Sequence, residues 1–117
     1  MIFKDVPIPI LVDEALYKLH INSWIAWEPI KAPHAIIIGA TGSGKTYFSK
    51  LLLGKTALYG NNTTIYVCDF KGDDDFSFLD GCDNYFHFME CSDGLDRYYD
   101  LFLKRQNKST SNRNLLI

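Results

Sequence analysis

The sequence predicts an α/β fold in which helices flank a mostly parallel sheet. Three stretches carry this prediction: the apolar run AIII at 35–38, the glycine-rich GATGSGKT at 39–46, and the β-rich TIYVCD at 64–69. A short apolar run that enters a glycine turn is typical of a strand buried on both faces. Residues 35–69 are therefore expected to form one strand–helix–strand unit with a right-handed crossover.

The helix of this unit is predicted to begin at Lys45 and to stop at Gly60-Asn61-Asn62. Its apolar side chains recur near helical spacing, at Phe48, Leu51, Leu52 and Leu58. The run at 64–69 is predicted as a strand because β-branched and aromatic residues dominate it.

The remaining elements follow in order. KGDDDFSFLDG at 71–81 is predicted as a polar loop with one helical turn, and YFHFM at 85–89 as a third strand. A helix capped by Ser92 or Asp93 comes next. Its apolar stripe should lie on the sheet, and consists of Leu95, Tyr98, Tyr99, Phe102 and Leu103. NKSTSN at 107–112 indicates a loop, and LLI at 115–117 the start of a strand.

Composition limits the size and setting of the molecule. A chain of 117 residues, 47% of them hydrophobic, holds one core. The chain is therefore expected to be one domain or part of one. The formal charge of -2 gives no overall field for attracting nucleic acid.

Cysteine usage and hydropathy indicate a cytoplasmic setting. Cys68, Cys82 and Cys91 form no CxxC pair, which favours reduced thiols over a zinc site or a disulfide framework. No apolar run approaches the ~20 residues of a bilayer span. We therefore expect a cytoplasmic chain without a membrane segment, and leave membrane association open for the complete protein.

GATGSGKT fits the phosphate-loop pattern G-x-x-x-x-G-K-[ST] between a predicted strand and a predicted helix. The glycines let successive N–H groups point at phosphate oxygens, and the helix N-terminus adds its positive dipole end. Lys45 would reach the β- and γ-phosphates, and the Thr46 hydroxyl would ligate Mg²⁺. The predicted ligands are ATP and Mg²⁺, and the nucleotide-binding residues are Gly39, Ala40, Thr41, Gly42, Ser43, Gly44, Lys45 and Thr46.

Asp69 is the candidate for a second carboxylate. It ends the apolar run IYVCD, which has the form of a Walker B strand. Taken alone, this pattern favours a small-molecule kinase-like protein in which Asp69 holds the metal. A non-catalytic remnant that binds nucleotide or a partner protein is a further alternative.

PHAIIIGATGSGKT at 33–46, followed by CDFKG at 68–72, resembles the FtsK/SpoIIIE family of double-stranded DNA translocases. A Pro-His pair opens the phosphate-loop strand there, and an Asp-Pro-Lys signature ends the next strand. LDRYYDLFLKRQ at 95–106 and IPI at 8–10 are also similar to family segments. The chain departs at Phe70, where the family usually has proline.

The resemblance implies a RecA-like core and an ATP-driven motor, with a homo-oligomeric ring, a hexamer, around duplex DNA. Such motors serve chromosome segregation or mobile-element transfer. In this family the Walker B pair is Asp-Glu and follows a strand that begins where this chain has residues 114–117. The resemblance thus implies that 1–117 is a single partial domain, with a lead-in segment at 1–34 and the first half of an ATPase core at 35–117. Such a truncated chain would bind ATP but lack the carboxylates for hydrolysis, with Asp69 not the principal metal ligand.

Other polar and aromatic residues have simpler interpretations. Trp24 and Trp27 are expected to fill a core or cover a sheet edge. His34 is expected to have a structural role in the turn, and the run Asp73-Asp74-Asp75 to be solvated surface. Basic residues near the end are too few to indicate a phosphate-binding surface: Lys104, Arg105, Lys108 and Arg113.

Overall fold

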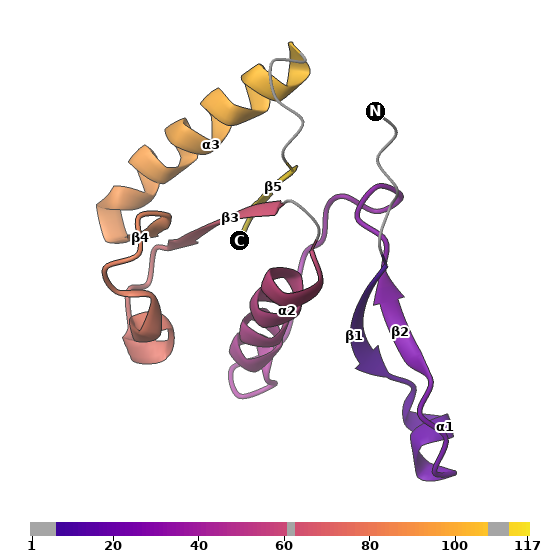
Figure 1. The fold of residues 1–117 in the computed structure, drawn as a ribbon. Coiled ribbons are helices and arrows are strands. Elements are labelled where there is room, and N and C mark those ends of the chain that lie inside the picture. The colour runs from indigo at the N-terminus through magenta and orange to yellow at the C-terminus, as the bar shows by residue number, and fades with distance from the viewer. Residues whose placement is uncertain (1–6, 61–62, 108–112) are drawn as a thin grey trace. The chain divides into compact units, whose positions relative to one another are not determined.

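The computed structural model describes residues 7–60, 63–107 and 113–117. The chain divides into two compact units, Met1–Asn61 and Asn62–Ile117. Figure 1 shows the elements of each unit, and the two are described separately below.

The first unit contains a two-stranded antiparallel sheet and the helix that follows the glycine-rich stretch. Strand β1 (Ile8–Val12) pairs with β2 (Trp24–Trp27), with Ile8 opposite Trp27 and Val12 opposite Trp24. The register shifts between Pro9 and Leu11, as expected where proline offers no N–H to the ladder. Between the strands, the short helix α1 (Glu14–Lys18) is capped by the Asp13 carboxylate, which accepts from the Leu16 N–H at 3.0 Å.

Helix α2 (Lys45–Tyr59) begins where the sequence predicts. Its N-cap is Gly44, and the N–H of Gly60 closes its last turn on the Thr56 oxygen at 2.7 Å. The helix contacts β1 and buries Leu53 and Thr56. Part of the predicted stop, Asn61-Asn62, lies outside the described residues.

The predicted strand at 35–38 is wrong for this structure. Residues 32–40 adopt no regular secondary structure, and the side chains of Ile36 and Ile38 are 87% and 89% exposed. A strand needs a neighbour for its main-chain hydrogen bonds, and neither sheet formed by the described residues includes residues 35–38. Hydrophobicity predicted burial, but it does not specify a pairing partner.

The second unit holds a parallel sheet in the order β4-β3-β5. The central strand β3 (Thr63–Asp69) pairs with β4 (Tyr85–His87) through Val67 opposite Tyr85 and Asp69 opposite His87. On its other edge β3 pairs with β5 (Arg113–Leu116). The predicted α/β class is confirmed, as a mixed structure with a three-stranded parallel sheet that is compatible with part of a RecA-like core.

Short helical turns connect the strands of this unit. The 3-10 helix η1 (Asp74–Leu79) provides the helical turn predicted in the loop after β3. Strand β4 ends at His87, earlier than the predicted run to 89, because Phe88 has a φ of 51° and starts the turn η2 (Phe88–Glu90). The predicted loop at 107–112 lies outside the described residues except for Asn107.

Helix α3 (Cys91–Gln106) packs against all three parallel strands (Figure 1). The core beneath it is formed by Tyr66, Phe86 and Cys91, with Tyr98 and Leu101 packed against them. Gly94 is buried in this contact, since a Cβ there would lie 2.6 Å from the Phe86 ring.

The stripe predicted to lie on the sheet is therefore only partly correct. Tyr98 faces the core, where its ring meets Tyr66 edge to face at 6.0 Å. Leu95, Tyr99 and Phe102 are half exposed. The small residues Cys91 and Gly94 allow the face of α3 that carries them to approach the sheet. Apolar periodicity alone does not predict that this face is the one in contact.

Candidate nucleotide-binding loop

The loop at 39–44 leads directly into the N-terminus of α2. Gly42 and Gly44 have φ values of 83° and 95°, in the left-handed region that residues with a Cβ avoid. A Cβ at Gly39 would meet the Ser43 hydroxyl, which would have to rotate away. The left-handed backbone thus explains two glycines of the motif, Gly42 and Gly44.

The Lys45 side chain crosses the loop that precedes it. Its ammonium donates hydrogen bonds to the main-chain oxygens of Gly39 and Ala40, the latter at 3.0 Å. The Ser43 N–H donates to the same Ala40 oxygen at 3.1 Å and closes the turn. The cation is therefore held at the helix end, beside the backbone of the glycine-rich loop.

The electrostatics of this helix end favour an anion. The N-terminus of an α-helix carries a partial positive charge on its free N–H groups. Helix α2, which is described over its whole length, has no acidic residue in its first turn. The positive dipole end and the Lys45 ammonium therefore lie together without a nearby carboxylate in that turn to neutralise them.

Thr46 lies in the first turn of α2 and is half-buried. A hydroxyl oxygen is a hard ligand that suits Mg²⁺, which keeps several waters and takes further oxygens from phosphates. The residues present at this helix end thus fit a Mg²⁺–nucleotide pair. Their role in binding stays a prediction, as does that of Thr46 in metal ligation.

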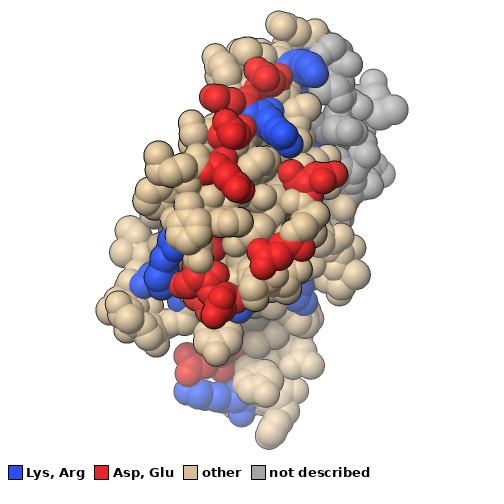
Figure 2. Space-filling model, turned by 90° about the vertical axis from the view of Figure 1, so that its left-hand side faces the viewer, with Lys and Arg blue, Asp and Glu red and all other residues tan. Residues whose placement is uncertain are grey.

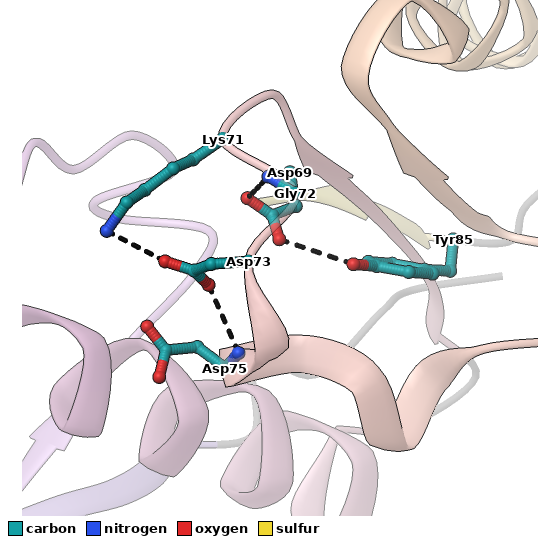
Figure 3. Close-up of polar contacts among 6 residues, drawn as sticks. All are labelled: Asp69, Lys71, Gly72, Asp73, Asp75 and Tyr85. Carbon is teal, nitrogen blue, oxygen red and sulfur yellow. Dashed lines mark hydrogen bonds and ion pairs between the residues drawn. The ribbon is translucent and has the colours of Figure 1, made fainter.

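Asp69 lies in the second unit, at the end of β3. Its Oδ1 accepts a hydrogen bond from the Gly72 N–H at 3.1 Å, and its Oδ2 accepts one from the Tyr85 hydroxyl at 3.2 Å (Figure 3). Burial, and next the charge of Asp69, raise the pKa of Tyr85 to about 12. Each carboxylate oxygen thus has a protein donor within its own unit.

An ion pair follows Asp69 in the same loop. The Lys71 ammonium lies 2.7 Å from Asp73 Oδ2, and Asp73 Oδ1 accepts from the Asp75 N–H at 3.1 Å (Figure 3). The hydrogen bond between the two side chains raises the pKa of Lys71 and lowers that of Asp73. Of the acidic run 73–75, Asp73 therefore caps η1, a local structural role.

Sequence reasoning missed Tyr85 and Gly72 as partners of Asp69. The only signal was the parallel pairing of the strands, whose register sets Tyr85 opposite Val67, two residues before Asp69. In the part of the chain that the structure describes, no three His, Cys, Asp or Glu side chains form a group that could hold a metal ion.

In the first unit, Trp24 and Trp27 have structural contacts. The Trp27 indole donates to the Ala32 oxygen at 2.6 Å, and Lys55 lies 4.6 Å from the centre of the Trp24 ring. His34 is exposed.

None of the helices within the described ranges has the length and hydrophobicity that crossing a membrane requires.

Comparison with protein families gives one match. The family model described as Helicase HerA, central domain, matches residues 18–112, which include the glycine-rich loop, α2, the β3–β4 pair and α3. Searches of curated proteins and of solved structures found no match.

Proposed function

This chain belongs to the Helicase HerA central-domain family of P-loop ATPases, and from that premise we propose that it binds Mg²⁺–ATP through residues 39–46. The observation that carries the proposal is the position of Lys45. Its ammonium donates hydrogen bonds to the main-chain oxygens of Gly39 and Ala40 at the N-terminus of α2. In the loop beside it, Gly42 and Gly44 have φ values in the left-handed region. A cation, a helix dipole and a glycine backbone together form an anion site.

Binding would exchange one set of Lys45 partners for another. The ammonium would leave the oxygens of Gly39 and Ala40 and reach the β- and γ-phosphates, whose negative charge makes a stronger hydrogen bond than a neutral carbonyl. Loop N–H groups would hold the phosphate oxygens, and the Thr46 hydroxyl would ligate Mg²⁺. The bound Mg²⁺ would supply positive charge that offsets part of the charge of the phosphates.

The finer proposal is that the chain is the nucleotide-binding part of a double-stranded DNA translocase similar to FtsK/SpoIIIE. It rests on the Pro33-His34 pair, the glycine loop and the Asp69–Lys71 signature. In such a protein the chain would work within a homo-oligomeric ring around DNA. The resemblance places the hydrolytic acidic pair after a strand that begins at residues 114–117, so we propose that Asp69 is not the hydrolytic carboxylate.

Calorimetric titration with Mg²⁺–ATP tests the binding proposal. Lys45→Ala is expected to abolish measurable affinity, because the loop loses its one charge for the phosphates. Lys55→Ala is the matched control on the same helix, since Lys55 contacts the rings of Trp24 and Tyr59. Undiminished affinity of Lys45→Ala, with the helical circular dichroism of the parent, would refute the proposal.

A turnover assay tests the hydrolysis proposal independently. With Lys45→Ala as the control for background, phosphate release by the parent chain is expected to persist in Asp69→Asn, because Asp69 is not the metal-holding carboxylate in the translocase proposal. Turnover above that control which disappears in Asp69→Asn would instead support the kinase-like alternative.

A further inference from the structure

The ends of two neighbouring parallel strands are joined through the Asp69 carboxylate. Asp69 is the last residue of β3, and Tyr85 is the first of β4. The Tyr85 hydroxyl donates to Oδ2 from the neighbouring strand, while the Gly72 N–H donates to Oδ1 from the following loop. One side chain thus ties a strand, its neighbour and a turn together (Figure 3).

The turn that Asp69 holds is closed by two residues in the left-handed region. Gly72 has a φ of 63°, and Phe88, just after β4, has a φ of 51°. They meet directly, because a Cβ on Gly72 would lie 2.4 Å from the Phe88 ring. A left-handed non-glycine residue costs free energy and persists only where its surroundings hold it in place.

The same turn presents a cation at the carboxyl end of the sheet. Lys71 lies between Asp69 and Gly72, its side chain is 80% exposed, and its ammonium is paired with Asp73. In open α/β sheets, ligands bind outside the carboxyl ends of the strands. The conformation of residues 70–73 therefore decides where Lys71 is displayed at that edge.

We propose that Asp69 is a positioning residue that, through Gly72 and Tyr85, fixes the 70–73 loop and with it the Lys71–Asp73 pair. Each Asp69 oxygen accepts one hydrogen bond, so the carboxylate is oriented by one donor from the loop and one from the neighbouring strand. The inference rests on contacts within the second unit and is independent of nucleotide binding at 39–46.

Amide exchange in the full chain tests the Gly72 contact. In Asp69→Ala, exchange of the Gly72 N–H is expected to accelerate roughly 10- to 100-fold, as loss of a hydrogen bond to a charged acceptor implies. Asp69→Asn should retain much of the protection, because its amide oxygen can still accept from Gly72 and its NH₂ can donate to the Tyr85 oxygen. Asp96→Asn, an exposed change on α3, is the matched control.

Lysine labelling tests the consequence for Lys71. Loss of the Asp73 pair leaves the amine easier to deprotonate, so acetylation of Lys71 should be faster in Asp69→Ala, with Lys18 as an internal reference. Asp69→Asn should restore slow labelling. A role for Asp69 confined to overall stability would leave labelling of Lys71 in the folded protein unchanged, and that result would overturn the proposal.

A double-variant cycle and a metal titration complete the test. Asp69→Ala and Tyr85→Phe should be non-additive in stability, while Asp69→Ala and Tyr99→Phe should add, because Tyr99 is exposed on α3. Millimolar Mg²⁺ without nucleotide should leave the NMR signals of Gly72 and Tyr85 unchanged. Additivity in the first pair, or Mg²⁺-dependent shifts that vanish in Asp69→Asn, would overturn the proposal.

Discussion

The Lys45 ammonium donates a hydrogen bond at 3.0 Å to the main-chain oxygen of Ala40, five residues earlier in the chain. The residue expected to bind phosphate is thus held by the loop that would surround the phosphate. A lysine ammonium has three donors and no acceptor, so carbonyl oxygens are suitable partners for it. If the proposed binding occurs, an incoming phosphate would replace existing hydrogen bonds and would not have to order a free side chain.

Two glycines of the same region should respond oppositely to alanine. Gly44 has a φ of 95° with open space around its Cβ position, so Gly44→Ala meets backbone strain alone. We expect it to lower the free energy of unfolding by ~1–2 kcal/mol. Gly54 lies inside α2, also in open space, and Gly54→Ala should raise that free energy by ~0.5–1 kcal/mol. Urea unfolding monitored at the helical band measures both, and equal effects would contradict the left-handed conformation of Gly44.

Gly94→Ala should destabilise the contact between α3 and the sheet. The new methyl group would lie 2.6 Å from the Phe86 ring and 3.0 Å from the Cys68 sulfur. Overpacking of this kind costs ~1–3 kcal/mol, which exceeds the ~0.5–1 kcal/mol gained by removing a glycine from a helix. Thermal unfolding should give a lower Tm than the parent. A higher Tm would mean that α3 does not approach the sheet so closely.

Alkaline pH should weaken the second unit through Tyr85. Burial and the Asp69 charge raise the pKa of this hydroxyl in the fold to about 12 from its ordinary value of 10.0. As the pH rises, Tyr85 therefore keeps its proton in the folded protein after the unfolded chain has lost it. The contribution of Tyr85 to the free energy of unfolding is present below pH 10 and is lost as the pH rises toward 12. Tyr85→Phe should flatten this part of the unfolding free energy curve. An unchanged slope would show that Tyr85 is not the responsible group.

Duplex DNA should bind this chain only weakly. Residues 62–117 carry ten Asp and Glu against six Lys and Arg, and carboxylates are spread over the face shown in Figure 2. Few cations are available to displace counterions, so the affinity should change little with salt. Fluorescence anisotropy across a salt series measures the slope. Tight binding with a steep slope would place a DNA site within these residues.

Local signals in the sequence were sufficient for much of the fold. The start of α2 at Lys45 follows from the glycine-rich stretch and the apolar spacing after it, and β3 from its β-branched residues. The strand predicted at 35–38 failed because pairing depends on a neighbour that periodicity does not specify. The helix stripe at 95–103 was only partly right because Gly94, which carries no hydrophobic signal, marks the face that meets Phe86.

The candidate site was also predictable only in part: its local geometry could be predicted, but its contact between strands could not. The local geometry at Gly42, Gly44 and Lys45 is set by neighbouring residues, so a motif can indicate it. The bond between Asp69 and Tyr85 joins residues far apart in the sequence and depends on strand register. A carboxylate after an apolar strand is therefore equally consistent with a metal ligand and with a structural hydrogen-bond acceptor. Only the residues that contact it in the fold distinguish these two roles.

The exposure of Ile36 and Ile38 has a consequence for the behaviour of the chain in concentrated solution. Extended β-branched segments with no charge and unpaired main-chain groups can template edge-to-edge association between molecules. This segment is short and is bounded by Pro33 and Gly39, residues of the kind that interrupt such pairing. We therefore expect the solubility limit of the chain to depend on how well Pro33 and Gly39 restrict strand pairing of residues 35–38 between molecules.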